Sequence, residues 1–113
     1  MEQEPFDWRG FSEEMGLDAS TVKSLYQVFG DELEADLTAL RRAALQADEP
    51  ACMRLIHKIK GTSVSYRATR LHELASEADN YYKRRQGHDA ARVLPQILTE
   101  GSIVCQSINT WRE

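Results

Sequence analysis

Long apolar runs are missing from this chain of 113 residues. No segment approaches the roughly 20 consecutive apolar residues that a membrane-spanning helix needs. The acidic start, residues 1–5, also lacks the apolar stretch of a secretory signal peptide. We therefore expect a cytoplasmic protein with no role in a membrane.

Cysteine, proline and glycine are scarce, with two, three and six residues respectively. Cys52 and Cys105 are far apart in sequence and form no C-x-x-C motif, so two buried thiols are a better interpretation than a disulfide scaffold. Runs of β-branched residues and strand-like alternation are absent as well. These absences favour an all-helical protein.

An excess of basic residues is also missing, since the chain has 18 acidic and 14 basic residues and a net charge of −4. The charge is uneven: residues 1–49 contain twelve acids and four bases, whereas residues 50–72 contain five bases and no acid. Such a basic band indicates an anionic group or an acidic partner, although pairing with acids from other helices would produce the same count. An acidic chain without a recognition motif argues against nucleic-acid binding.

Four segments show apolar residues at every third or fourth position, the pattern of amphipathic helices. The first starts at a cap on Asp18 or Ser20, and the second starts near Pro50. The third follows a break near residues 67–69, and the fourth, capped by Asp89, extends over about residues 90–111. The short connections predict one domain over residues 1–113: an antiparallel up-down-up-down four-helix bundle (18–113), with a short capping helix in residues 1–17.

The second segment places three residues that could form a reactive site on one helical face. Lys60 and Gly61 follow His57 by three and four positions, so the imidazole has a cation beside it and open space above it. That arrangement suits a histidine that carries a phosphoryl group. Spacing alone is equally compatible with a solvated face and an incidental histidine, and with Gly61 serving close helix packing.

A carboxylate joins this group if the second and third helices form a hairpin near residue 67. His57 and Asp79 then lie at the same height, and Lys83 flanks them one turn away. Asp79 would accept the Nδ1 hydrogen and leave Nε2 available to attack, while Lys60 stabilises phosphoryl oxygens.

Other chemistries lack the residues they need. His72-Glu73 would need a histidine at position 76 to form a zinc-protease helix, and Ser76 stands there instead. We expect no metal and no cofactor, and place His72 and His88 at the surface or in turns. No glycine-rich ATP lid is present, so the chain is not expected to be an enzyme that phosphorylates itself.

The stretch from His57 to Ser63, HKIKGTS, resembles the H-x-x-K-G-[ST]-[SA] signature of histidine phosphotransfer (HPt) domains, which are helical intermediates of two-component phosphorelays. Residues 29–40 and 68–79 also resemble the family's flanking helices, and the similarity spans roughly residues 20–110. The resemblance implies that His57 is the phosphoacceptor, Lys60 the cation beside the phosphate and Gly61 the clearance residue. The position of Asp79 is often Glu or Gln in the family and can bond the imidazole.

Two departures from the family pattern accompany this resemblance. Tyr66-Arg67 stands where the family usually has Leu-Gly, at the turn between the second and third helices. Asp79 is also one methylene shorter than the usual Glu, so a direct contact with the imidazole is expected to fall short.

The resemblance predicts a phosphocarrier that accepts a phosphoryl group from a receiver-domain aspartyl phosphate, or from a hybrid sensor histidine kinase, and passes it to a response-regulator receiver. Any Mg²⁺ would belong to the receiver, and the carrier is expected to be a monomer. The alternative is a helical adaptor that binds signalling partners without carrying phosphate. The predicted docking face comprises Met53, Arg54, Lys58, Val64 and Arg67, with Met15 and Leu17 extending it.

Overall fold

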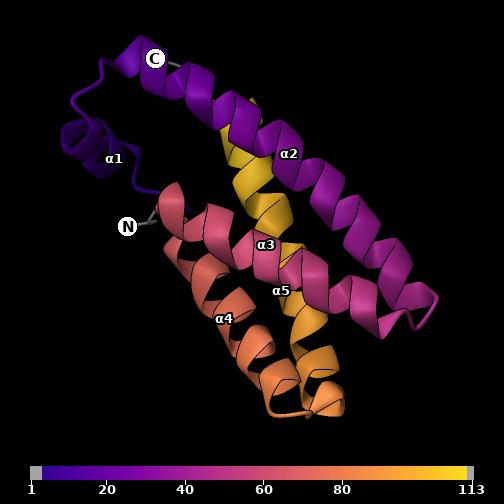
Figure 1. Cartoon of the computed structure of the whole chain (residues 1–113). Helices are drawn as coiled ribbons and strands as arrows, with labels where there is room; N and C mark the ends of the chain where they lie inside the picture. The colour runs from indigo at the N-terminus through magenta and orange to yellow at the C-terminus, as the bar shows by residue number, and fades with distance from the viewer. Residues whose placement is uncertain (1–3, 112–113) are drawn as a thin grey trace.

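Every regular element in the described part of the chain, residues 4–111 of this computed structural model, is an α-helix (Figure 1). The prediction of an all-α fold is therefore confirmed. No described helix combines the length and apolar character needed to span a bilayer. The helices are α1 (Trp8–Met15), α2 (Ala19–Leu45), α3 (Glu49–Ser65), α4 (Thr69–Lys83) and α5 (Gly87–Asn109).

Aspartate side chains begin the first three helices. Asp7, Asp18 and Asp48 accept hydrogen bonds from backbone N–H groups three residues further on, which compensates for partners that helix termini lack. The cap of α5 was predicted wrongly. Its N-cap is Gln86, and Asp89 lies in the first turn, where its negative charge suits the positive end of the helix dipole.

The three connections between α2 and α5 share one backbone conformation. Each has a residue other than glycine in the left-handed region: Ala47 (φ 53°), Arg67 (φ 56°) and Arg85 (φ 61°). A helix commonly ends with such a residue just after its C-cap, and glycine is the usual occupant. The predicted break near residues 67–69 is confirmed, and Arg67 stands at the left-handed position that glycine would favour.

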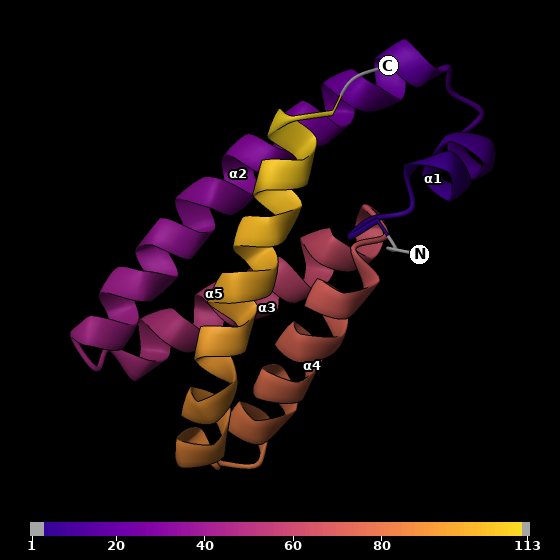
Figure 2. The ribbon, with the colours of Figure 1, turned by 180° about the vertical axis from the view of Figure 1, so that it is seen from behind.

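Helices α2 to α5 pack around one core. Figure 1 shows the chain turning back at each connection, and Figure 2 shows α5 passing along α4 and then α2. α3 and α5 therefore lie on opposite sides of the bundle (Figures 1 and 2). Contacts join α2 to α3, α3 to α4, α4 to α5, and α5 back to α2.

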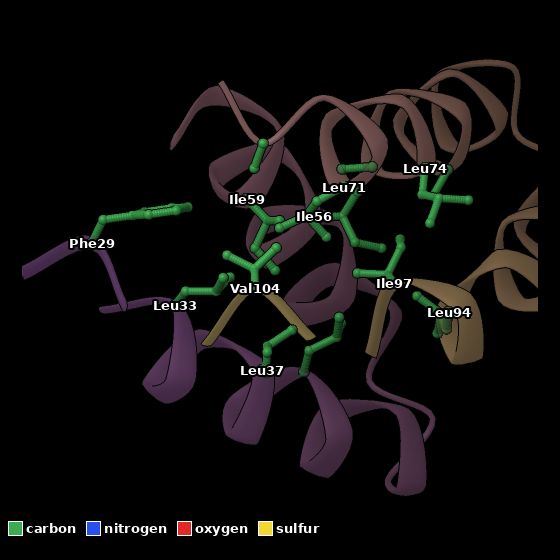
Figure 3. Close-up of a cluster of buried hydrophobic side chains, with 14 of the residues drawn as sticks. Phe29, Leu33, Leu37, Ile56, Ile59, Leu71, Leu74, Leu94, Ile97 and Val104 are labelled. Atoms are coloured by element: carbon green, nitrogen blue, oxygen red, sulfur yellow. The ribbon is translucent and has the colours of Figure 1, made fainter. Parts of the chain in front are cut away.

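The core is built from aliphatic side chains of all four long helices, which converge in Figure 3. Glycines let α2 and α5 approach closely: a Cβ on Gly101 would lie 2.7 Å from the Leu37 side chain, and one on Gly30 would lie 3.3 Å from Ile108. The expectation of two buried thiols is half right, because Cys52 is buried and Cys105 is only half-buried. Core side chains labelled in Figure 3 include Leu33, Leu37, Ile56, Ile59, Leu71, Ile97 and Val104.

An aromatic cluster attaches α1 to the bundle, as the apolar leading segment predicts. The Tyr66 ring stacks on Phe29 (centroids 4.5 Å apart) and on Phe11 of α1 (5.2 Å). The buried Tyr26 hydroxyl donates to the Tyr66 carbonyl at 2.6 Å. Arg67 adds ion pairs to Asp7 and to Glu14 of α1. The Tyr66-Arg67 pair thus connects the α3–α4 turn to α1.

Candidate functional site

Helix α3 presents His57 to solvent because its apolar residues point the other way. Cys52, Ile56, Ile59 and Ser63 are buried, whereas the His57 side chain is 71% exposed. Residues three or four positions from His57 share its face. The predicted exposure of the imidazole is therefore a direct consequence of the helical pattern.

The carboxylate predicted to meet His57 comes from α4. Asp79 is buried, with 6% of its surface exposed, and its Oδ1 lies 3.6 Å from His57 Nδ1. That separation is within ion-pair range but exceeds the usual 2.7–3.2 Å of a hydrogen bond. The two residues are level as predicted. The short aspartate side chain comes within ion-pair range of the imidazole but falls short of a hydrogen bond.

Two lysines share the other oxygen of the same carboxylate. Lys60 Nζ and Lys83 Nζ each lie 3.0 Å from Asp79 Oδ2. Burial raises the pKa of the Asp79 carboxyl, but hydrogen bonds and charge from Lys83 and Lys60 outweigh it, and the net pKa is below the ordinary value. Asp79 is thus an ionised carboxylate near neutral pH, with one oxygen facing the imidazole and the other facing two cations.

This geometry decides which imidazole nitrogen is available for chemistry. A carboxylate beside Nδ1 favours the tautomer with its proton on Nδ1 and its lone pair on Nε2. The structure gives Nε2 of His57 no hydrogen-bond partner within residues 4–111. The exposed nitrogen is therefore the one able to act as a nucleophile.

Gly61 leaves open space beside His57. A Cβ built on Gly61 would meet no atom within 4 Å outside its own helix segment. Close helix packing is thus the wrong explanation for this glycine. A glycine inside a helix costs about 1 kcal/mol relative to alanine, so its presence at an open position favours a need for clearance.

His72 also supports this site, although its sequence spacing gave no sign of that. Its Nδ1 lies 3.0 Å from the Lys60 carbonyl and its Nε2 lies 3.4 Å from Ser76 Oγ. The ring is half-buried and contacts both α3 and α4, so this surface residue also joins the two helices. These contacts depend on how α3 and α4 pack against each other, which the sequence spacing does not give.

The predicted docking residues differ in exposure and in whether their charges are already paired within the chain. Met53 and Val64 are 39% and 53% exposed, and Arg54 is exposed with no ion pair to described residues. Lys58 contacts Asp36 (3.1 Å) and Glu32 (3.4 Å) on α2. Arg67 is paired with Asp7 and Glu14, so acids from other elements compensate part of the basic band.

Metal coordination has no support in the part of the chain that the structure describes. Within residues 4–111, no three His, Cys, Asp or Glu side chains lie together in a way that could hold an ion. The site is instead one imidazole, one carboxylate and two ammonium groups.

The chain also matches a known protein family. The family model described as Hpt domain matches residues 24–106. The chain belongs to the Hpt domain family. Searches of curated proteins and of solved structures found no match. Hpt domains are phosphocarrier modules of two-component phosphorelays, in which histidine takes part in phosphotransfer with receiver domains and kinases.

Proposed function

We propose that this Hpt domain, as an antiparallel up-down-up-down bundle, carries a phosphoryl group on Nε2 of His57. One observation supports this most strongly: an exposed imidazole has an ionised carboxylate on its Nδ1 side, while Nε2 has no hydrogen-bond partner among residues 4–111. A helical adaptor would need neither this carboxylate nor the clearance at Gly61.

The transfer step follows from the positions of these groups. The Nε2 lone pair attacks the phosphorus of an aspartyl phosphate on a receiver domain, and the bond from phosphorus to the aspartate oxygen breaks. The receiver keeps its carboxylate, and the positive charge that develops on the imidazole is stabilised by Asp79 beside Nδ1. Passing the group to a response-regulator aspartate is the same step in reverse.

Lys60 and Lys83 supply positive charge next to the imidazole. Both ammonium groups lie 3.0 Å from Asp79 Oδ2, on the carboxylate whose other oxygen faces His57 Nδ1. Phosphoryl oxygens carry negative charge, so two nearby cations lower the energy of the loaded histidine. We assign Lys83 to the site together with His57, Lys60, Gly61 and Asp79.

The partners proposed for this domain are response-regulator receiver domains and a hybrid sensor histidine kinase. The required Mg²⁺ would be bound by the receiver. We propose that the domain acts as a monomer in the cytoplasm and meets its partners through the face around His57.

Incubation with a panel of phosphorylated receiver domains tests this function. The wild-type chain should gain an acid-labile, alkali-stable phosphoryl group, and the His57→Gln variant should gain none. His88→Gln is the matched control, because His88 is exposed on α5 and is no part of the site. Receiver binding without any labelling would favour the adaptor alternative instead.

A further inference from the structure

A cavity of about 890 Å³ opens at the end of the bundle away from α1. Residues of the α2–α3 and α4–α5 connections line it, and both connections lie at this end of the bundle (Figure 1). Of the site described above, only Lys83 also lines the cavity, and Met53 of the predicted docking face lines it as well. Small-molecule sites commonly measure about 300–1,000 Å³ and combine an apolar lining with a few polar groups. Its size therefore suits a small ligand.

Apolar side chains form the inner part of this cavity. Cys52 and Tyr82 are buried there, and Leu94 of α5 lines it as well. Burial raises the pKa of Tyr82 to about 12, with further contributions from Cys52 and Glu49, so its hydroxyl stays neutral. This inner part would accept the apolar body of a ligand.

Charge is distributed unevenly around the opening. Lys83, Arg85 and His88 line it beside the α4–α5 connection. The single acid of the lining is Glu49. Its carboxylate lies so close to the start of α5 that a Cβ on Gly87 would overlap it. The basic side of the opening thus favours an anionic group.

Arg85, like Ala47 in the same lining, has a positive φ, and it also carries a charge. Its φ of 61° places it in the left-handed region, which is unfavourable for a residue other than glycine. Arg67 has the same strain, but its side chain forms ion pairs with Asp7 and Glu14. The structure gives Arg85 no ion pair with any residue between 4 and 111.

We propose that this cavity binds an amphiphilic monocarboxylate, such as a medium-chain fatty acid. The carboxylate would pair with the Arg85 guanidinium at the opening. The hydrocarbon chain would lie against Cys52, Tyr82 and Leu94. Lys83 lines the cavity and also contacts Asp79 of the His57 site, but the binding needs no phosphoryl group and can be measured on the unphosphorylated chain.

The test is titration of the ¹⁵N-labelled protein with octanoate below its micelle concentration, followed by amide chemical shifts. Octanoate should give saturable shifts around Cys52, Tyr82 and Leu94. Octyltrimethylammonium, which has the same chain and the opposite charge, should bind more weakly. Ala91→Phe places an aromatic ring at the exposed lining residue Ala91 and should abolish saturation.

Arg85→Gly removes the charge and also relieves the backbone strain at this position, because glycine tolerates a positive φ. It should keep or raise the thermal midpoint and weaken octanoate binding roughly two- to fivefold, the effect of one exposed ion pair. Arg84→Gln is the matched control, because Arg84 is equally exposed and does not line the cavity. Tighter binding of octyltrimethylammonium, an Ala91→Phe variant that binds octanoate normally, or non-saturable shifts only would overturn the proposal.

Discussion

At the residue scale, the site depends on how one buried carboxylate is shared. Asp79 faces His57 with Oδ1 and holds Lys60 and Lys83 with Oδ2. Burial of an ionised group is unfavourable unless it is paired, and here the two lysines provide the pairing. The same carboxylate therefore orients the imidazole and keeps two cations beside it.

The pH dependence of stability should reveal this pairing. The pKa of Asp79 is below 3.8 in the folded chain, so its stabilising effect is complete above the unfolded pKa and is lost as pH falls through the folded pKa. At neutral pH, Asp79→Asn should lower the free energy of unfolding by about 1.5–3 kcal/mol, as for hydrogen bonds to charged groups. The measurement is denaturant unfolding at a series of pH values.

The gap between wild type and Asp79→Asn should close as the pH is lowered below 3.8. A gap that stays constant down to the most acidic condition at which both chains fold would show that the charge of Asp79 is not what stabilises the site. Asp89→Asn, at an exposed pair with Arg92, should show a much smaller gap throughout.

Gly61 and Gly101 should respond in opposite directions to the same substitution. Gly61→Ala should stabilise the chain by up to about 1 kcal/mol, because alanine favours the helix and the new Cβ meets nothing. Gly101→Ala should destabilise it, since the new Cβ would lie 2.7 Å from the buried Leu37 side chain and overpacking costs about 1–3 kcal/mol.

Thermal unfolding and phosphotransfer rates, measured together, check this pair. Gly61→Ala should slow transfer despite its greater stability, because the methyl group enters the clearance beside His57. A Gly61→Ala variant that transfers at the wild-type rate would show that the open space has no role in the reaction.

At the element scale, the α3–α4 turn connects α1 to the pair of helices that hold His57 and Asp79. The Arg67 carbonyl accepts a hydrogen bond from the Asp7 backbone N–H at 3.1 Å, and its side chain reaches Asp7 and Glu14. The Tyr66 ring stacks between Phe29 and Phe11. This turn therefore positions α1 as well as reversing the chain.

Arg67→Gly should separate these two functions. Glycine relieves the positive φ of the turn, while both ion pairs to the α1 segment disappear. Amides of α1 should exchange faster with deuterium, and those of α3 and α4 should keep their protection. Unchanged exchange in α1 would show that the aromatic contacts and the backbone hydrogen bond from Asp7 hold this helix without the ion pairs.

The helical pattern of the sequence predicted much of the fold and of the site, and the features that it did not predict have physical causes. Apolar periodicity located the helices and the exposed face of His57, and helix rise placed Asp79 at the right height. It did not reveal His72 on the Lys60 carbonyl or the acids that pair with Lys58, because those contacts depend on how two helices are rotated about their axes. The start of α5 was misplaced because Asp89 suits both a cap and a first turn.

At the scale of the whole molecule, the docking face is more apolar than a count of basic residues suggests. Lys58 and Arg67 are paired with acids of the same chain, whereas Met53 and Val64 are exposed beside His57. Arg54 remains as the basic residue of this predicted face without an ion pair to residues 4–111. We expect apolar contact to contribute more to partner affinity than steering by charge.

Val64→Glu should therefore weaken receiver binding strongly and leave the thermal midpoint nearly unchanged, because Val64 is 53% exposed. Ile103→Glu is the matched control: Ile103 is 44% exposed but lies on α5, across the bundle from α3 (Figure 2). Calorimetric titration with a cognate receiver measures the binding of both variants, and thermal unfolding measures their midpoints. Equal losses for the two variants would contradict docking through the His57 face.

The central claim is that the geometry around His57 directs a phosphoryl group to one nitrogen of one residue. The measurement is ¹⁵N NMR of histidine-labelled protein after transfer from a phosphorylated receiver, which distinguishes the ring nitrogens. We predict a phosphorus–nitrogen bond at Nε2 of His57, with His72 and His88 unmodified. A bond at Nδ1, or modification of either other histidine, would contradict the account.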